Sequence, residues 1–563
     1  MSIHKGPVTL LSAASARALD AEASASWGLD SFALVEAAGR RCARVLAAAF
    51  PEFFPPKNNP FMVILAGSGN NAADAMVMLR SLLLSGHVDG EGAALVINKV
   101  PEKELRSPRS EAFLSLQKMG VPVTVWKQDA ALIEGLLSRA DIIIDGIAGT
   151  GLDGPLQGSA AEMLALINKY KDTKLLISID LPSGSSDSWQ PGMPIAKAGA
   201  TLAIEPLKLC LFRPAARPYS GAILPVGEVF PPQLIGQFHG QKNISAEHAG
   251  GRTQSSAELI DWDRAASLIP PVSSAAYKHE RGVVEIRAGS PDAPGAARIA
   301  ARGAQAVGAG LIRLVVDQAI HPILAVNAGG IMVAGETACG SFPGEAGDGA
   351  RFSPDAVLLG PGWGKSPDRE VMLRHALEQE AAGIPLILDA DAILLAKDYV
   401  FHGNALLTPH PGELAAYAGV SKDGLLSDPA PLLLKVAAEK KAVILFKSHV
   451  MYAASPDGRL GIIDGMQAVL GMGGSGDLLA GFCAGIAARQ KSAGRVEGGS
   501  GGMANTGLPD SGLYFCALAA AALLIESAKS PESGSRFLDP LELADTAADL
   551  AGKAWLPGRL CHG

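Results

Sequence analysis

The chain has 563 residues, a length that suits two large domains or about three ordinary ones. Hydrophobic residues make up 48% of it and charged residues 18%, which is enough apolar material for buried strands and argues against extensive disorder. The formal net charge of -8 and an aromatic content of 5% argue against a nucleic-acid partner, because nucleic-acid binding needs a basic surface.

The termini and the cysteines favour a cytoplasmic protein without a membrane partner. The N-terminal residues lack the apolar core of a signal peptide, and no uninterrupted apolar run reaches the roughly 18 residues of a membrane span. The cysteines show no C-x-x-C spacing and no neighbouring histidine cluster, so we expect buried thiols in a reducing compartment. They are Cys42, Cys210, Cys339, Cys483, Cys516 and Cys561.

The first half of the chain begins with two predicted helices, residues 13–23 and 31–49. Short apolar runs then alternate with helix-length segments. This alternation predicts βαβ units and a parallel sheet that is covered by helices on both faces. The predicted strands are residues 61–66, 93–97, 121–125, 142–144 and 175–179.

Residues 237–256 are polar, contain glycine and show no periodicity, so we predict an interdomain linker there. It separates a domain of residues 1–236 from a second domain of residues 257–563. The α/β pattern restarts after the linker, with helices at residues 296–308 and 368–382. The predicted strands of this half are residues 283–287, 311–316, 356–359, 385–388, 405–407 and 442–446.

A glycine-rich loop, residues 471–477, leads directly into an apolar helix predicted for residues 478–488. Unpaired N–H groups at the start of a helix suit a phosphate, and Asp477 could accept the proton of an attacking hydroxyl. Because the helix N-terminus stabilises a carboxylate, we expect Asp477 to be a weak base. About half of such loops are only tight turns, so the loop alone leaves both explanations open.

Four further loops of the second half follow predicted strands, where open α/β sheets bind their ligands. They bring carboxylates, an imidazole and an ammonium group to the same edge of the sheet. Each loop by itself is explained at least equally well by a turn, an N-cap carboxylate, a satisfied histidine or a solvated lysine, but together they favour an active site. The loops are residues 358–364, 388–392, 407–413 and 446–448.

The motifs GPGWG, LDADAI, TPHPGE and GGSGDLLAG, in this order, resemble the dehydratase domain of NAD(P)HX repair enzymes, which has a ribokinase-like fold. The resemblance covers residues 277–554. It implies a domain that uses ADP, or ATP as in the eukaryotic branch, to phosphorylate the hydroxyl of the S hydrate of NADH or NADPH. Loss of phosphate then restores NAD(P)H. Mg²⁺ is the implied metal of this half.

By the same resemblance, Asp477 is the base. Lys447, Ser448 and His449 lie near the nucleotide. The implied anion hole is Gly474, Ser475 and Gly476, and the implied site for the hydrated nicotinamide includes Ala296, Gly362 and His410. The family has glycine where this chain has His279 and Ser448. A non-glycine residue with a positive φ there would cost about 1 to 2 kcal/mol.

The first half carries a glycine turn before a predicted helix, residues 67–75, and two more polar strand ends, residues 145–152 and 179–184. Together with the sequence LVEAAG at residues 34–39, they resemble the epimerase domain of the same repair system over about residues 8–230. The resemblance implies a Rossmann-like three-layer fold. It implies Asp180 as the acid/base residue that interconverts R and S hydrates, and Lys208 as its helper.

The resemblance further implies a K⁺ site at Asn71, Asp145 and Ser183. The implied substrate-binding residues are Asn70, Asn71, Asp74, Gly149, Thr150, Gly151, Leu152, Pro155 and Asp180. The family pattern N-N-G-G-D-G is altered here, since Ala72, Ala73 and Ala75 replace glycines. The added methyl groups are harmless if these residues are helical, and they impair the reaction if they contact the ligand.

The sequence therefore predicts an α/β protein with an N-terminal Rossmann-like domain and a C-terminal ribokinase-like domain. The predicted function is repair of NADHX and NADPHX by epimerisation and nucleotide-dependent dehydration. Two alternatives stay open: a small-molecule kinase of the ribokinase superfamily, and a degenerate nucleotide-binding regulator without turnover. We also expect a homo-oligomer.

Overall fold

The computed structural model describes residues 8–54, 59–101, 106–238, 256–269, 271–336, 353–364, 366, 368–497, 512–529 and 536–556. The chain divides into two compact units, Met1–Ala257 and Glu258–Gly563. Most of the predicted linker, residues 237–256, lies outside the described residues.

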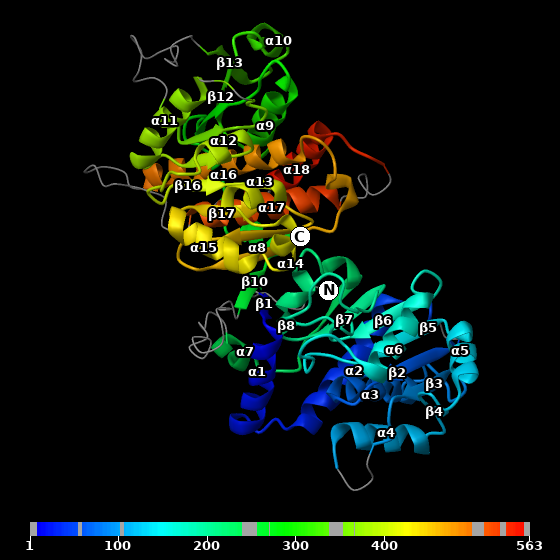
Figure 1. Cartoon of the computed structure of the whole chain (residues 1–563). Helices are drawn as coiled ribbons and strands as arrows, with labels where there is room; N and C mark the ends of the chain where they lie inside the picture. Colours follow the sequence, from blue (N-terminus) through cyan, green and yellow to red (C-terminus); the bar gives the residue numbers. More distant parts are fainter. Residues whose placement is uncertain are drawn as a thin grey trace. The chain divides into compact units, whose positions relative to one another are not determined.

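The first unit contains a fully parallel sheet with the strand order β4-β3-β2-β5-β6-β7-β9 (Figure 1). Its strands are β2 (Met62–Ala66), β3 (Ala93–Ile97), β4 (Val123–Val125), β5 (Ile142–Gly146), β6 (Leu175–Ile179), β7 (Ala200–Ile204) and β9 (Ala222–Val226). A separate parallel pair joins β1 (Val8–Leu11) to β8 (Leu207–Lys208). The helices are α1 (Ala13–Ser26), α2 (Ser31–Ala49), α3 (Asn70–Leu84), α4 (Pro108–Lys118), α5 (Ala130–Arg139), α6 (Gly158–Ile167) and α7 (Pro232–Phe238).

This sheet is the middle of three layers. Met62 and Ile64 of β2 pack into one apolar cluster with α2 and α3, whereas Val63 and Leu65 pack into another with α5 and α6. Successive side chains of a strand point to opposite faces, so a strand that is apolar on both faces requires helices on both sides. The predicted Rossmann-like three-layer architecture is confirmed.

The predicted helix starts in this unit are correct because each has an N-cap. The hydroxyl of Ser12 accepts a hydrogen bond from Ser15 N–H before α1, and the carboxylate of Asp30 accepts one from Ala33 N–H before α2. Strands β7 and β9 were not predicted.

The second unit contains a mixed sheet with the strand order β13-β12-β11-β14-β15-β16-β17-β18-β19-β10. The pairing is parallel from β13 to β17 and antiparallel from β17 through β18 to β19, and β10 runs parallel to β19. The strands are β10 (Ser256–Leu259), β11 (Val283–Arg287), β12 (Leu311–Val316), β13 (Ile331–Gly335), β14 (Ala356–Leu359), β15 (Leu386–Leu388), β16 (Ala405–Leu407), β17 (Val443–Phe446), β18 (Val450–Ala454) and β19 (Leu460–Asp464).

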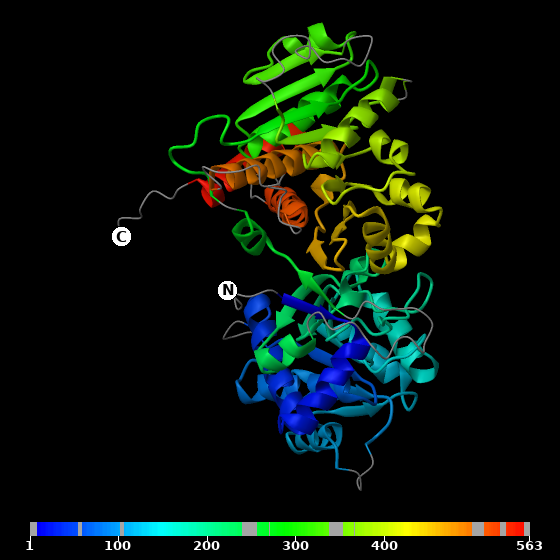
Figure 2. The same ribbon diagram turned by 90° about the vertical axis from the view of Figure 1, so that its left-hand side faces the viewer.

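Helices cover both faces of this sheet as well (Figure 2). A large apolar cluster joins α9, α16, α17 and α18 to one face, and α11 and α15 contact other strands of the sheet. The helices are α8 (Trp262–Ser267), α9 (Pro294–Ala306), α10 (His321–Ala325), α11 (Asp368–Ala381), α12 (Asp391–Leu395), α13 (Pro411–Ala418), α14 (Lys422–Ser427), α15 (Ala430–Lys440), α16 (Ser475–Glu497), α17 (Gly512–Ala528) and α18 (Pro540–Trp555). Helix α16 begins before the predicted helix 478–488 and continues beyond it.

Four cysteines are buried free thiols, as predicted: Cys42, Cys210, Cys483 and Cys516. Burial raises the pKa of each thiol. Cys339 and Cys561 lie outside the described residues. Among the helices that the structure describes, none combines the length and the apolar composition needed to cross a bilayer.

Candidate active sites

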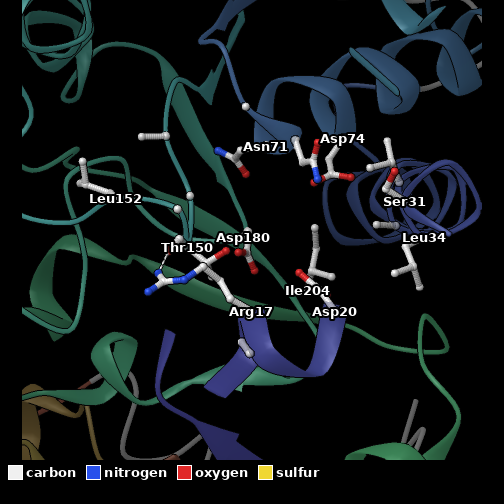
Figure 3. A pocket seen from close by; sticks show the side chains of 18 of the residues that line it. Arg17, Asp20, Ser31, Leu34, Asn71, Asp74, Thr150, Leu152, Asp180 and Ile204 are labelled. Carbon is white, nitrogen blue, oxygen red and sulfur yellow. Dashed lines mark hydrogen bonds between the residues drawn. The ribbon is translucent and has the colours of Figure 1, made fainter. Parts of the chain in front are cut away.

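The first unit has a cavity of about 500 Å³ beyond the carboxyl ends of its strands (Figure 3). Most of the predicted substrate-binding residues line it, namely Asn70, Asn71, Asp74, Gly149, Thr150, Gly151, Leu152 and Asp180. Pro155 is exposed and does not line the cavity. It follows a turn at Gly154, whose φ of 85° redirects the chain.

Asp180 lies directly after β6 and is held by a buried ion pair. Its Oδ1 atom is 2.5 Å from the ammonium nitrogen of Lys208, which also donates to the carbonyl of Ile204 at 2.9 Å. The φ of Asp180 is 63°, a conformation that non-glycine residues rarely adopt. Such strain persists where the surrounding structure holds a functional side chain in place.

Two more carboxyl groups face the same cavity. Burial raises the pKa of Asp74 well above its ordinary value, and the charges of Asp180 and Asp20 raise it further. Asp20 comes from α1, and burial raises its pKa to about 6, with Lys208 lowering it and Asp180 raising it. Asp20 was not among the predicted site residues, although its spacing from Arg17 and Ser24 places all three on one helical face.

The loop at residues 145–152 begins with Asp145, one of the predicted K⁺ ligands, and contacts the other two, Asn71 and Ser183. Gly149 of this loop lies against Asn71, since a Cβ there would be 3.2 Å from the Asn71 side chain. Ala148 donates its N–H to the Ser183 hydroxyl at 2.9 Å. Ser183 in turn donates its backbone N–H to Asp145 at 2.9 Å.

The electrostatics around these ligands fit a bound cation. Within the described residues, both polar atoms of the buried Asn71 amide lack a hydrogen-bond partner. Burial raises the pKa of Asp145 despite hydrogen bonds from Ser183 and Ser178. No lysine or arginine of the described residues forms an ion pair with Asp145. Amide, carboxylate and hydroxyl oxygens are suitable ligands for a hard cation.

The alanines that replace the family's glycines are helical. Ala72, Ala73 and Ala75 lie in the first turns of α3 and are fully buried in the apolar cluster beneath it. None of the three lines the cavity, whereas their neighbours Asn71 and Asp74 do. The added methyl groups therefore belong to the core.

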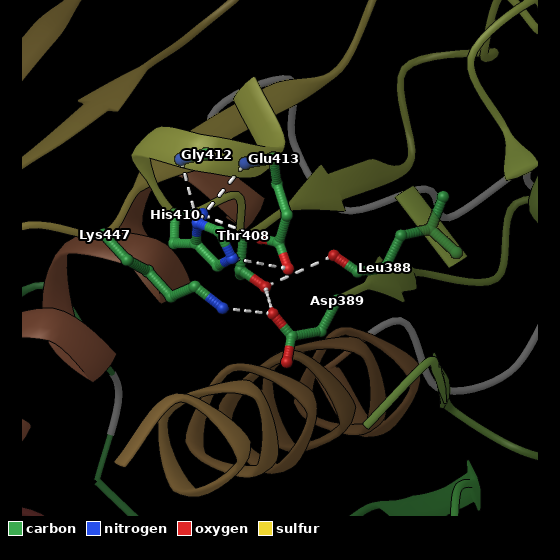
Figure 4. A network of polar contacts seen from close by, with 7 residues as sticks. All are labelled: Leu388, Asp389, Thr408, His410, Gly412, Glu413 and Lys447. Atoms are coloured by element: carbon green, nitrogen blue, oxygen red, sulfur yellow. Dashed lines mark hydrogen bonds and ion pairs between the residues drawn. The ribbon is translucent and has the colours of Figure 1, made fainter. Parts of the chain in front are cut away.

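The strand-end loops of the second unit form a polar cluster (Figure 4). Lys447, directly after β17, forms an ion pair with Asp389, directly after β15. The hydroxyl of Thr408, directly after β16, donates to the same Asp389 oxygen at 2.6 Å. Burial opposes the charge of Lys447, but the carboxylates of Asp389, Glu413 and Asp477 raise its pKa above the ordinary value.

The start of α16 completes this cluster. A Cβ at Gly476 would lie 3.4 Å from the Lys447 ammonium nitrogen, so the cation is beside the predicted anion hole of Gly474, Ser475 and Gly476. Asp477 follows in the first turn of α16. Burial and the charge of Asp389 raise its pKa to about 6, although Lys447 lowers it.

This finding corrects the expectation that Asp477 is a weak base. The expectation considered only the helix N-terminus, which favours the ionised form. Burial and a neighbouring carboxylate outweigh it, so Asp477 is a stronger base than an exposed aspartate.

The predicted nicotinamide-site residues are partly brought together. Gly362 lies against Ala296, because a Cβ at Gly362 would be 2.6 Å from the Ala296 Cβ. His410 is the N-cap of α13, where its Nδ1 atom accepts hydrogen bonds from the N–H groups of Gly412 at 2.9 Å and Glu413 at 3.3 Å. The alternative of a satisfied histidine is therefore correct for Nδ1, and the half-exposed ring remains open to a ligand.

The replaced glycines around the nucleotide carry no backbone strain. Neither His279, Ser448 nor His449 is among the described non-glycine residues with a positive φ. Ser448 closes the turn between β17 and β18 by accepting the N–H of Val450 at 3.2 Å. The observations that supported a degenerate regulator, glycine losses in both units, thus have ordinary structural explanations.

Taken together, the fold and these two sites define a two-unit α/β enzyme, with a cavity lined by carboxyl groups in one unit and a cluster of charged side chains beside a helix N-terminus in the other. Family models match both units. Residues 284–499 match the family described as NAD(P)H-hydrate dehydratase, and residues 31–210 match the family described as YjeF-related protein N-terminus.

Relatives match nearly the whole chain. The bifunctional NAD(P)H-hydrate repair enzyme Nnr of Moorella thermoacetica is 30% identical over 492 residues, which are 85% of this chain and 88% of the relative. The protein of the same name from Gloeobacter violaceus is 30% identical over 494 residues, with 85% and 89% covered. The ADP-dependent (S)-NAD(P)H-hydrate dehydratase of Xanthomonas campestris pv. campestris is 35% identical over 216 residues, which are 38% of this chain and 74% of the relative. The chain belongs to the family of bifunctional NAD(P)H-hydrate repair enzymes.

Proposed function

We propose that this chain repairs hydrated NADH and NADPH through two reactions, one in each unit. The first unit interconverts the R and S hydrates. The second unit dehydrates the S hydrate to NAD(P)H at the expense of a nucleotide. The observation that carries the proposal is that family similarity extends over 85% of the chain, while both sites keep their acid/base groups.

In the second unit, Asp477 is the base that accepts the proton of the substrate hydroxyl as it attacks phosphorus. Its pKa of about 6 leaves it ionised at neutral pH and still basic enough to take the proton. The N–H groups at the start of α16 and the ammonium of Lys447 stabilise the charge on the transferred phosphoryl group. Phosphate is then a good leaving group: it departs with the electron pair of the C–O bond, and loss of a proton from the neighbouring ring carbon to solvent creates the ring double bond.

The co-substrate is a nucleotide, and ADP is the one we favour, with Mg²⁺ as its counter-ion. Lys447, Ser448 and His449 form the turn that approaches it. Because Ser448 has no positive φ, its side chain replaces the family's glycine without a backbone cost.

In the first unit, Asp180 is the acid/base residue and the ion pair with Lys208 holds it in place. K⁺ binds Asn71, Asp145 and Ser183. The cation would supply positive charge that orients the substrate loop at residues 145–152. The unpaired amide of Asn71 is the observation that supports it.

The test is to incubate the purified chain with hydrated NADH, Mg²⁺, K⁺ and either ADP or ATP. Return of NADH absorbance with release of inorganic phosphate supports the dehydratase. A stable phosphorylated product without NADH would instead identify a small-molecule kinase, and no reaction with either nucleotide would contradict the proposal. Epimerisation is measured separately: one purified hydrate should equilibrate with its epimer faster in the presence of the chain than in buffer alone.

A further inference from the structure

Helix α1 brings two charged side chains to the cavity of the first unit. Its N-cap is Ser12, and its apolar side, including Leu19 and Ala23, is buried in the core. Arg17 and Asp20, three residues apart, face the cavity instead. Asp20 therefore reaches the site from a helix that is distant in sequence from the strand-end loops.

Arg17 anchors this helix to the substrate loop. Its guanidinium donates a hydrogen bond to the carbonyl of Thr150 and lies 3.7 Å from the carboxylate of Asp153. The anchor lies one turn before Asp20 on the same helical face. Asp20 is thus held at the cavity by a contact with the loop that is expected to bind the substrate.

Several charged groups share the cavity with Asp20. They are Arg17 on the same helix, Asp74 on α3, Asp180 after β6, and Glu205 and Lys208 near β8. Glu205 accepts hydrogen bonds from the N–H groups of Val229 and Phe230, and Lys208 is paired with Asp180. Helix α2 contributes only uncharged side chains to the lining.

The two carboxyl groups of Asp20 and Asp180 differ in their surroundings. Asp180 is paired with the buried ammonium group of Lys208, whereas Asp20 has no ion pair within the part of the chain that the structure describes. Groups whose environments differ in this way take opposite acid and base roles. An inversion at one carbon needs two such roles, because the hydroxyl leaves one face and water adds to the other.

We propose that Asp20 is a second acid/base residue of the epimerisation, working with Asp180 from a different wall of the cavity. This inference rests on the proposed function of the first unit. Asp20 gives its proton to the hydroxyl of the hydrate as the C–O bond breaks, and the bonding electron pair leaves with the water formed. The lone pair of the ring nitrogen forms a C=N bond and leaves a cationic ring.

Water then adds to the other face of this carbon. The new C–O bond forms as Asp180 takes one proton from the water, and the C=N electron pair returns to nitrogen. The products are the opposite epimer, ionised Asp20 and protonated Asp180. Proton exchange with solvent restores the starting state, and the reverse reaction uses the same groups in exchanged roles.

The test compares the wild-type chain with Asp20→Asn and Asp20→Glu in equilibration of a purified hydrate, followed by NMR. We expect Asp20→Asn to slow the enzyme-catalysed rate by about 10²-fold or more, and Asp20→Glu to retain part of it. The wild-type rate should fall as pH rises through about 6, where Asp20 loses its proton. The rate of Asp20→Asn should not show this fall.

Glu22→Gln is the matched control, since Glu22 lies on the same helix outside the cavity lining, and it should leave the pH profile unchanged. Nucleotide-dependent dehydration by the Asp20→Asn chain should equal that of the wild type. The role of Asp20 would be overturned if Asp20→Asn kept the wild-type rate, or if its rate still fell as pH rises through about 6. If the wild-type chain does not accelerate equilibration at all, the proposed epimerase itself is wrong, which is a distinct outcome.

Discussion

The sites of the two units contain the same kinds of charged groups, but different elements of the fold supply them. Each contains a Lys–Asp ion pair at a strand end, Lys208–Asp180 in the first unit and Lys447–Asp389 in the second. Each also contains a carboxyl group with a pKa of about 6. Each pair also involves a non-glycine residue with positive φ: in the first unit it is Asp180 itself, and in the second it is Ala390, which follows Asp389.

The difference lies in how far apart in sequence the groups are. In the second unit the titrating group, Asp477, is part of a contiguous glycine-rich motif. In the first unit it is Asp20, from a helix near the start of the chain that lines the same cavity. One lesson is that a paired lysine fixes one carboxylate while burial makes a second one titrate near neutrality, whichever elements supply them.

The largest expected effect is that of Asp477→Asn. Loss of the base should lower the rate of dehydration by about 10²- to 10⁴-fold and leave epimerisation intact. Because the folded chain favours the protonated form of Asp477, the neutral asparagine should also raise the melting temperature at pH 7. NADH absorbance and calorimetry measure the two effects.

Asp423→Asn is the matched control for this prediction. Asp423 also lies in the first turn of a helix, α14, but it is exposed. Dehydration by this variant should equal that of the wild type. Full activity of Asp477→Asn would refute the assignment of the base.

Asp180→Ala should have a comparable effect in the other unit. It removes the acid/base group and leaves the Lys208 ammonium buried without its carboxylate. We expect enzyme-catalysed equilibration of the hydrates to fall by about 10²-fold or more, while dehydration of the S hydrate is unaffected. If both reactions fall together, the two sites are not independent and the comparison fails.

Asp389→Asn tests whether the ion pair in the second unit positions Lys447. Loss of a hydrogen bond between charged groups, about 1.5 to 3 kcal/mol, should raise the KM for the nucleotide by about tenfold or more. Dehydration needs ionised Asp477, so the wild-type rate should rise with pH through about 6. In Asp389→Asn this rise should move to lower pH, because a negative charge that raises the pKa of Asp477 is gone.

A purely structural role of Asp389 would leave the position of that rise unchanged. The pH dependence of kcat, measured beside the melting temperature, separates the two roles.

Replacing K⁺ by Na⁺ should slow epimerisation several-fold if Asn71, Asp145 and Ser183 hold the larger cation. Asn71→Ala should lower the rate in K⁺ and make the remaining activity insensitive to the change of cation. Equilibration rates across a K⁺ titration measure both. A wild-type rate that is indifferent to K⁺ would remove the cation from the proposal.

The smallest effects are expected for Ala72→Gly and Ala73→Gly, which restore the family's glycines. Each should lower the free energy of unfolding by about 1 kcal/mol, because glycine is disfavoured in a helix. The epimerisation rate should not change, since neither side chain lines the cavity. A faster reaction in the glycine variants would mean that the alanines do contact the ligand.

Local sequence patterns determined much of this protein. Residues 93–97, 175–179 and 311–316 were predicted as strands with the observed bounds, because buried parallel strands are continuous apolar runs. The predicted α/β class of both halves is confirmed. Strands β18 and β19 were missed because their antiparallel pairing produces no helix-length spacing.

The motifs also placed Lys447, Asp477 and Asp180 at strand ends or a helix start, where the structure has them. Only the tertiary structure decided their pKa values and which charged side chains surround them. The pKa of Asp477 depends on burial and on Asp389, which is far away in sequence, so the local helix argument had the wrong sign. Asp20 reaches the cavity only because α1 packs into the apolar core of the first unit through Leu19 and Ala23. Chain-local interactions select strands, helices and turns, whereas desolvation and charge coupling arise from distant segments that meet in the fold.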